Sequence, residues 1–211
     1  MYYVRFPLSL RNVEDILHMR GIDICHETVR YWWNKLGPTV AKELMKKRTH
    51  APSKWRWHLD EVFVKINGKI HYLWRAIDHE GTVIDCFVSK RRNKRAALKF
   101  LKKAVKFHTP PKQIVTDKLG SYRAALRELD MSHLQETKRY KNNQIENSHL
   151  HFRRREKIMN RFRSMGSLQK FTAIQSQFQN HFSQERHNEK RQTFKNLRQS
   201  SLDAWNEILV A

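Results

Sequence analysis

The fold is decided by residues 55–88, WRWHLDEVFVKINGKIHYLWRAIDHEGTVIDCFV. Apolar side chains recur at every second residue, at Trp57 and Leu59 and then at Val62, Val64 and Ile66, as they do in a strand with two different faces. The Asn67-Gly68 pair that follows is the strongest short signal for a tight hairpin turn. Alternation resumes over 70–76, and a second turn at Glu80-Gly81 leads into a third apolar run. The stretch therefore predicts a three-stranded antiparallel meander.

The segments after this meander predict the rest of the core. An apolar helical stripe covers 93–106, Pro110-Pro111 interrupts the chain, and a short apolar strand is expected over 113–116. Helical patterns follow over 122–129, 143–158 and 168–182, the last being an apolar stripe that we interpret as core packing. A meander, a helix and a short strand occur in that order in the ribonuclease-H-like fold. We therefore expect an α/β (α+β) core of this kind.

The N-terminal segment carries two amphipathic helical patterns, over 10–17 and 29–36, separated by Gly21. Gly37-Pro38 is expected to end the second helix. Helix, short turn and helix make a helix-turn-helix, whose second helix contacts the major groove, although an ordinary helical hairpin would show the same pattern. Residues 1–49 are thus predicted to form a small all-α DNA-binding domain, joined to the core by a linker over 46–54. The exposed side chains of its second helix would be His26, Glu27, Arg30, Tyr31 and Asn34.

Composition points to a polyanionic partner. The 211 residues carry a formal charge of +22, which exceeds what solubility alone requires and favours nucleic acid. Between Ser89 and Lys106 there are nine Lys or Arg and no acid, so this helix is predicted to follow phosphates rather than be an ordinary solvated face. The predicted phosphate contacts in this run are Lys90, Arg91, Arg92, Lys94 and Arg95.

The two cysteines and the apolar runs exclude other classes of protein. Cys25 and Cys86 lack the partners of a zinc module, so both are expected to be reduced and buried. No apolar run reaches 18 residues and no leader is recognisable, which predicts a cytoplasmic protein with no membrane partner.

Three acidic residues stand where a sheet-based site could form. Asp60 lies in the first strand, Asp117 ends the strand at 113–116, and Glu146 opens the helix at 143–158. Successive side chains of a strand point to opposite faces, so only one of Asp60 and Glu61 is expected to reach such a site, and alternation does not choose between them. Ordinary alternatives exist, such as an edge acid, a helix N-cap or a first-turn acid.

Carboxylates from a strand, a strand end and a helix can hold one or two divalent ions, because Mg²⁺ prefers oxygen ligands. Such ions activate a water or a 3′-hydroxyl and stabilise the leaving oxygen in a phosphoryl displacement. The sequence has no glycine-rich phosphate loop, no HExxH helix and no convincing Ser-His-Asp or Cys-His set. Metal-dependent phosphoryl transfer without a small-molecule substrate is therefore the predicted chemistry.

Several motifs together carry a family resemblance. They are WHLDEVFVK at 57–65, YLWRA at 72–76, TDK at 116–118, and the Asn142-Asn143 pair followed by Glu146-Asn147 and His149. With them, the chain from about Tyr3 onward resembles the small DDE transposases of bacterial insertion sequences, most closely the family typed by the sixth named element. Members usually carry a further helical segment ahead of this start, so the resemblance implies an N-terminally shortened domain.

The resemblance also implies roles for particular residues. Asp60, Asp117 and Glu146 would be the catalytic, metal-binding acids, with Mg²⁺ as cofactor and Mn²⁺ as a possible substitute. Asn143 and Arg153 would border the site and grip DNA, and we expect Arg154 to contact phosphate as well. The catalytic DDE domain would span 50–188, followed by a basic tail or helix over 189–211.

The expected function is that of a transposase. Such an enzyme binds the terminal inverted repeats of its element, nicks them and joins them to target DNA, working on double-stranded DNA as a dimer or higher homo-oligomer. An alternative is a catalytically inactive, truncated remnant that only binds DNA or represses. A structure-specific nuclease of the same fold is a third hypothesis.

Overall fold

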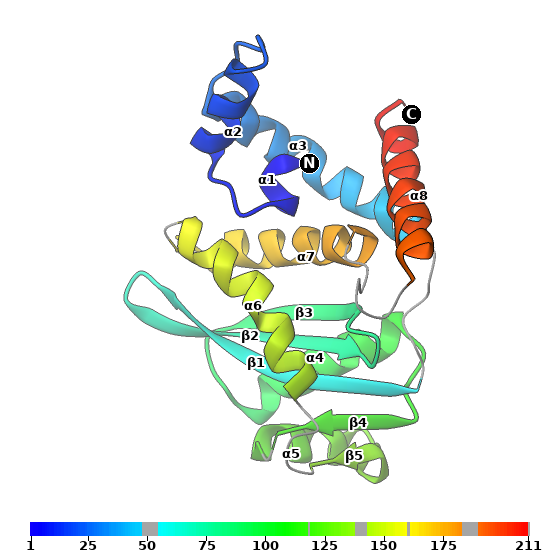
Figure 1. Cartoon of the computed structure of the whole chain (residues 1–211). Helices are drawn as coiled ribbons and strands as arrows, with labels where there is room; N and C mark the ends of the chain where they lie inside the picture. The colour runs from blue at the N-terminus through cyan, green and yellow to red at the C-terminus, as the bar shows by residue number, and fades with distance from the viewer. Residues whose placement is uncertain (48–54, 118, 138–142, 160, 183–189, 211) are drawn as a thin grey trace. The chain divides into compact units, whose positions relative to one another are not determined.

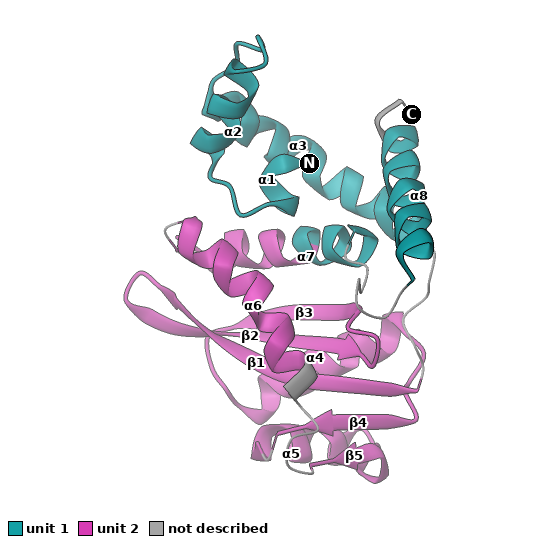
Figure 2. Cartoon of the chain, viewed as in Figure 1, with its two compact units in different colours: residues 1–51, 174–211 teal, residues 52–173 magenta. Residues whose placement is uncertain are grey.

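The computed structural model describes residues 1–47, 55–117, 119–137, 143–159, 161–182 and 190–210 (Figure 1). The chain forms two compact units (Figure 2). Unit 1 comprises residues 1–51 and 174–211, and unit 2 comprises residues 52–173. This division differs from the sequence-based one, which assigned 174–188 to the catalytic domain and 189–211 to a separate tail.

The C-terminal segment belongs with unit 1 because its side chains pack there. It contains the second half of α7 (Met165–Phe182) and all of α8 (Arg191–Val210). The rings of Phe178 and Trp205 lie 5.4 Å apart, and the Arg5 guanidinium lies 4.4 Å from the centre of the Phe182 ring. These contacts bury aromatic surface that a solvated tail would leave in water.

The rest of unit 1 consists of α1 (Tyr2–Arg5), α2 (Leu10–His18) and α3 (His26–Lys46). Ser9 caps α2 reciprocally with Asn12, and Gly21 has a φ of 75°, in the left-handed region that glycine adopts readily. The two predicted helices and the turn between them are therefore present. Within the second helix, however, Trp32 and Leu36 are 44% and 50% exposed rather than packed.

The prediction that Gly37-Pro38 ends the second helix is wrong. Helix α3 continues through this pair to Lys46, although a proline inside a helix costs about 3 kcal/mol. Gly37 is buried, and a Cβ there would stand only 3.2 Å from Ile174 Cδ1. Downstream, Leu44 is 1% exposed. The burial of this continuing apolar face outweighs the local preference of proline to stop a helix.

Unit 2 is built on a five-stranded sheet in the order β3-β2-β1-β4-β5. The first three strands are antiparallel, whereas β4 runs parallel to β1 and β5 runs parallel to β4. Asn67 and Gly68 have φ values of 48° and 79°, the tight turn expected of this pair. The predicted meander and short strand are thus confirmed. The strands are β1 Arg56–Ile66, β2 Lys69–Asp78, β3 Val83–Ser89, β4 Gln113–Thr116 and β5 Gln135–Glu136.

Helices cover both faces of this sheet (Figure 1). On one face, α4 (Lys94–Phe107) and α5 (Gly120–Glu128) form the main core with Trp57 and Trp74. On the other, Ile145 of α6 (Asn143–Ile158) packs with Ile77 and Val83. The predicted ribonuclease-H-like core is confirmed, and α4, α5 and α6 lie close to their expected ranges. The 3₁₀ turn Ser132–Leu134 and strand β5 were not expected.

One expectation about the cysteines is also wrong. Cys86 is buried, whereas Cys25 is exposed just ahead of α3, and both are free. Cys25 occupies the N-cap position of α3 at the surface, so its residue type alone did not determine its burial. Among the described helices, none is long and apolar enough to span a membrane.

Candidate functional site

The parallel pairing of β1 and β4 brings the first two predicted acids together. Their register ends where Leu59 lies opposite Thr116. Asp60 and Asp117 are the next residues after this pair, one along β1 and the other just after β4. The chain turns away from the sheet at this point, and Asp117 Oδ1 accepts a hydrogen bond of 3.0 Å from the Leu119 amide. A strand end therefore presents one carboxylate directly beside another.

A third carboxylate, that of Glu61, completes this cluster. Ligand oxygens of Asp60, Glu61 and Asp117 all lie within 4.8 Å of one another. The prediction that only one of Asp60 and Glu61 could reach a common site is wrong. Alternation still places them on opposite faces, but β4 stops opposite Leu59 and leaves the edge of β1 open beyond it. Side chains from both faces can reach around that open edge.

The cluster is buried enough to disfavour its own charge. The side chains of Asp60 and Glu61 are 18% and 1% exposed. Burial raises the pKa of Asp60 to about 6, and the charges of Asp117 and Glu146 raise it as well. Burial also raises the pKa of Glu61 to about 7, although the Arg92 guanidinium acts in the opposite direction.

Arg92 is the cation nearest to this cluster. It contacts Glu61 Oε1, and its Nη2 lies 3.4 Å from Asp117 Oδ2. Glu61 Oε2 is buried and has no hydrogen-bond partner among the described residues. The three carboxylates share the guanidinium of Arg92 and, beside Asp60, that of Arg75, so acids outnumber cations here. An unpaired buried carboxylate oxygen within such a cluster suits a divalent cation, which prefers oxygen ligands.

Glu146, the third predicted acid, lies in the first turn of α6 and is exposed. Its charge contributes to the raised pKa of Asp60, so it lies within electrostatic range of the cluster. Its carboxylate is not one of the three that come within 4.8 Å of one another. The structure thus brings Asp60 and Asp117 together with Glu61, and it holds Glu146 nearby on a separate helix.

Helix α6 is attached to the sheet by Arg75, a residue that sequence reasoning missed. Arg75 lies opposite Asp60 on β2, and its Nη1 donates a hydrogen bond of 3.0 Å to the Ser148 carbonyl. Burial lowers the pKa of Arg75 to about 10, which still leaves it charged at neutral pH. The available signal was a lone cation within the apolar strand 70–77.

His149, one turn beyond Glu146, faces the same cluster. Its Nδ1 lies 3.8 Å from Asp60 Oδ2, and its buried Nε2 has no hydrogen-bond partner within the described chain. Burial lowers the pKa of His149 to about 3, and the charges of Arg75 and Arg153 act in the same direction. The ring is therefore neutral at physiological pH.

The predicted DNA contacts on α3 lie on its solvent side, partly engaged with acids. His26 Nδ1 lies 2.9 Å from Glu14 Oε2, and Arg30 forms a 2.8 Å ion pair with Glu27. Tyr31 is 56% exposed, and Asn34 is exposed too.

The predicted contacts in unit 2 fall into three groups. Lys90, Arg91, Arg95 and Arg154 are exposed. Ion pairs involve the others: Arg92 as described, Lys94 with Glu128 at 2.7 Å, and Arg153 with Glu156 at 2.6 Å. For Asn143, only the backbone within α6 is described.

Comparison with known proteins gives a family to this site. A family model described as a DDE domain matches residues 54–185. The transposase for insertion sequence-like element IS431mec, from Staphylococcus aureus, is 34% identical over 160 residues, which cover 74% of this chain and 70% of that protein. The chain belongs to the DDE transposases of insertion sequences. The present chain is also 34% identical, with the same coverage, to the Staphylococcus aureus transposase for insertion sequence element IS257 in transposon Tn4003.

As a DDE transposase, the protein is a metal-dependent polynucleotidyl transferase. Among solved structures, the HTLV-2 integrase catalytic core domain in complex with magnesium aligns with 64% of this chain and 90% of its own. The identity is 14% and the TM-score is 0.47.

Proposed function

We propose that this transposase binds the terminal inverted repeats of its own element and catalyses divalent-metal-dependent DNA cleavage and strand transfer. The observation that carries the proposal is the carboxylate cluster of Asp60, Glu61 and Asp117, within 4.8 Å at the open edge of β1. The charge of Glu146 raises the pKa of Asp60, which supports Glu146 of α6 as a fourth carboxylate of the metal site. Family membership favours DNA as the substrate over other phosphoryl compounds.

In this proposal Asp60, Asp117 and Glu146 hold Mg²⁺, with Mn²⁺ as a substitute. A bound divalent ion would activate the attacking hydroxyl or water and stabilise the leaving oxygen of the phosphodiester. Glu61, the remaining carboxylate of the cluster, adds negative charge to the site, and Arg92 offsets part of it. Arg75 keeps α6 attached to β2 through Ser148, so that Glu146 stays within reach of Asp60.

His149 would act on the orientation of Asp60. Because its ring is neutral, it can donate an N–H toward the Asp60 carboxylate without adding charge to the site. The 3.8 Å separation is longer than a hydrogen bond, so this contact would tighten when the carboxylates draw together.

DNA recognition would be divided between the two units. The exposed side of α3 would contact base edges, and the cations of unit 2 would contact phosphates, which set position rather than sequence. Pairing of the two element ends requires at least two active sites. We therefore propose that the transposase works as a homo-oligomer on double-stranded DNA.

Strand transfer is the deciding experiment. A labelled duplex carrying one inverted repeat is incubated with supercoiled plasmid and Mg²⁺, and joined products are separated on a gel. The proposal expects joining by the natural protein and none by Asp117→Ala. A DNA-binding remnant would retain the duplex without cutting it, and a structure-specific nuclease would cut without joining. Either result would overturn the proposal.

A further inference from the structure

We propose that a cationic pocket at the distal end of α6 is a binding subsite for the phosphodiester backbone of DNA, away from the reacting phosphate. The inference rests on the proposed function, since it assigns a second contact for the same substrate. The pocket has a volume of about 560 Å³. It is lined by Lys65, Arg153, Glu156, Lys157 and Arg161.

The charge of this pocket fits a polyanion. Four cations face a single acid, and Glu156 is paired with Arg153 at 2.6 Å. Lys65, Lys157 and Arg161 form no ion pair and no side-chain hydrogen bond with any other described residue. Like charges that lack acidic partners of their own repel each other, so these three cations are stabilised when phosphates bind between them.

The residues that line the pocket favour a phosphate backbone over a nucleotide or another small phosphate compound as its ligand. Among the described residues, the lining consists of five long, charged side chains and includes no aromatic or apolar residue on which a base or sugar ring could stack. Binding of a nucleotide or another small molecule normally uses an apolar, concave surface with a few polar groups. The pocket therefore suits a phosphate backbone that passes across it.

The backbone at Arg161 is held in an unusual conformation. Its φ is 73°, in the left-handed region, and its amide donates a hydrogen bond of 3.2 Å to the Glu156 carbonyl where α6 ends. Glycine is the usual residue at such a helix end, because other residues are strained there. Phe162 fixes the segment by stacking on Phe152, with ring centres 6.0 Å apart. The fold thus holds an arginine in the pocket at a position that favours glycine.

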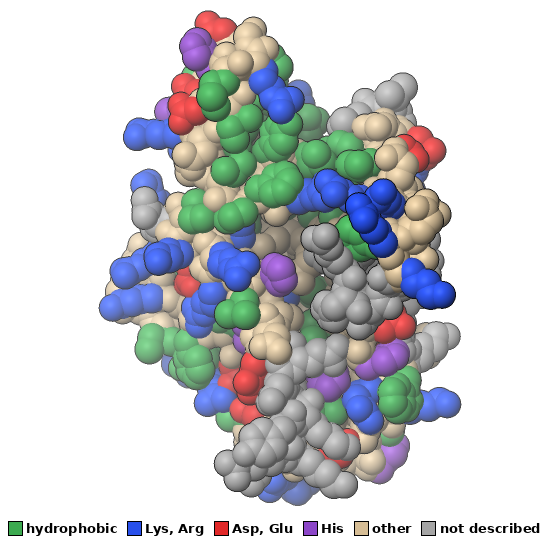
Figure 3. Space-filling view, viewed as in Figure 1, with side chains coloured by type: hydrophobic (Ala, Val, Ile, Leu, Met, Phe, Trp, Pro, Cys, Tyr) green, Lys and Arg blue, Asp and Glu red, His purple; other side chains and the backbone are tan. Residues whose placement is uncertain are grey.

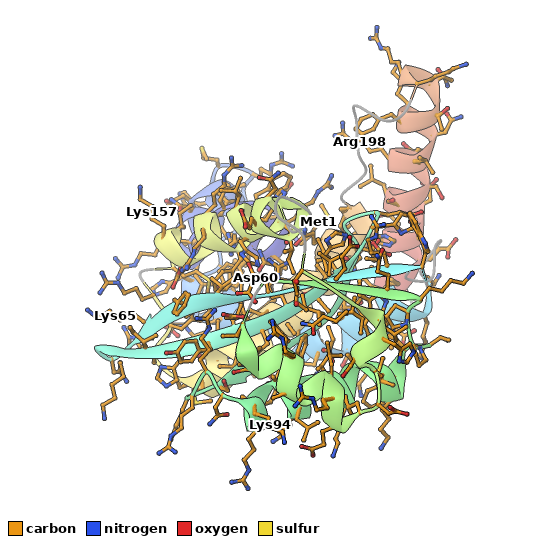
Figure 4. All side chains as sticks on the ribbon, turned by 90° about the horizontal axis from the view of Figure 1, so that it is seen from below. Met1, Asp60, Lys65, Lys94, Lys157 and Arg198 are labelled. Carbon is orange, nitrogen blue, oxygen red and sulfur yellow. The ribbon has the colours of Figure 1, made fainter. Side chains whose placement is uncertain are left out.

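The β1–β2 hairpin contributes the opposite wall. Asn67 Nδ2, at its tip, donates a hydrogen bond of 3.1 Å to the Arg163 carbonyl, which ties the hairpin to the segment after α6. In Figure 4, Lys65 and Lys157 lie toward the same side of the molecule, away from Asp60. Figure 3 shows Lys and Arg side chains gathered over this region of α6 and the hairpin.

The distance from the carboxylates predicts which phosphates would bind. Arg153 is seven residues beyond Glu146 on α6, or about 10 Å at the rise of an α-helix. Lys65 is five residues beyond Asp60 on β1, or about 16 Å at the rise of a strand. Duplex DNA rises about 3.4 Å per nucleotide along one strand. The pocket would therefore contact phosphates about three to five nucleotides from the reacting one.

The first test is the salt dependence of duplex binding by the variant Lys65→Ala/Lys157→Ala/Arg161→Gly. Glycine at 161 removes the guanidinium and suits the backbone, so folding is preserved. A matched control, Lys112→Ala/Arg123→Ala/Arg127→Ala, removes three exposed cations ahead of β4 and on α5. The salt slope is the slope of the logarithm of the binding constant against the logarithm of the salt concentration. We expect its magnitude to be smaller by about two to three in the pocket variant, at about 0.9 per phosphate contact. The control should lose less than one.

The second test uses neutral methylphosphonate linkages at single positions of a pre-cut repeat end. Linkages three to five nucleotides from the reacting phosphate should weaken binding by the natural protein but not by the pocket variant. Equal salt slopes for pocket variant and natural protein, or equal sensitivity to these linkages, would overturn the inference. Strand transfer is scored in parallel. Failure of joining by the natural protein would count against the proposed function alone, because pocket binding is measured without chemistry.

Discussion

Two segments of unit 2 are similarly rich in Lys and Arg, but their side chains have different partners in the fold. The first, Lys90–Lys106, begins ahead of α4 and continues through it, whereas the second, Arg153–Arg163, includes the last part of α6 and the segment after it. In the first run, Arg92 contacts Glu61, and Lys103 forms a 2.8 Å ion pair with Asp85. In the second, the 2.6 Å pair of Arg153 with Glu156 stays within one turn of the same helix.

The difference is that acids from distant parts of the chain pair with three of the nine cations of the first run. Helices α4 and α6 cover opposite faces of the sheet, and Figure 4 shows Lys94 and Lys157 on opposite sides of it. The α4 face meets the carboxylates of β1, β3 and α5. Among the described residues that line the pocket at the distal end of α6, one acid is present, Glu156 of the same helix. The cations behind the net charge of +22 are therefore not equally available to bind phosphates.

The largest expected effect comes from removing an acid partner of the first run. Asp117→Asn should lower strand transfer by about 10³-fold, because metal stabilisation of the transition state contributes several kcal/mol. Duplex binding should be unchanged or tighter, since Arg92 loses one of its two carboxylates. The control is Asp130→Asn, an exposed residue with a φ of 56° that asparagine tolerates. Weaker binding by Asp117→Asn would show that the acid does not compete with phosphates.

Next in size is the effect of pH on the metal-free protein. The folded-state pKa values of Asp60 and Glu61, about 6 and about 7, exceed their usual values of 3.8 and 4.5. The unfolded chain therefore ionises first as pH rises, and the free energy of unfolding should fall between about pH 4 and pH 7. The loss is on the order of 3 kcal/mol for each carboxyl.

Denaturation of the natural protein and of Glu61→Gln, in the presence of EDTA from pH 4.5 to 8, measures this effect. The glutamine variant removes one of the two titrating groups, so the stability of the natural protein relative to it should decrease as pH rises. A constant difference would mean that Glu61 is not strained by burial.

A smaller effect separates paired from unpaired cations within the first run. Lys94→Ala/Lys103→Ala removes two lysines that already have acidic partners at 2.7 and 2.8 Å. Lys90→Ala/Arg91→Ala removes two exposed cations. We expect the second pair to reduce the salt slope of DNA binding by about two, at about 0.9 per phosphate, and the first pair by less than one. Equal slopes would remove the distinction between the two kinds of cation.

The smallest effect concerns stability at the second run. Arg161→Gly relieves a left-handed conformation that costs about 1–2 kcal/mol of stability. Glycine also has more conformational freedom in the unfolded chain, which lowers the free energy of unfolding by about 0.5–1 kcal/mol. The net gain should be about 0.5–1 kcal/mol, visible as a slightly higher Tm, together with weaker DNA binding. Arg161→Ala keeps the strain and should show no gain. A lower Tm for the glycine variant would contradict this account.

Elements with local signals could be predicted from the amino-acid sequence. The period-two alternation, the Asn67-Gly68 turn and the apolar stripe of α4 predicted the meander and the helix after it. They also placed Asp60 inside a strand and Asp117 at the end of another. These features depend on neighbours within a few residues, which alternation, turn chemistry and helical periodicity record directly.

Contacts between distant residues depend on the assembled fold. Glu61 joins the carboxylates because β4 ends opposite Leu59 and opens the edge of β1, a register that no local pattern contains. Helix α3 passes through Pro38 because residues beyond it are buried. Arg92, although partly exposed, contacts the carboxylates of Glu61 and Asp117, which are far from it in the chain. Ion pairs and burial depend on positions far apart in the chain, so they are determined when the sheet assembles and not before.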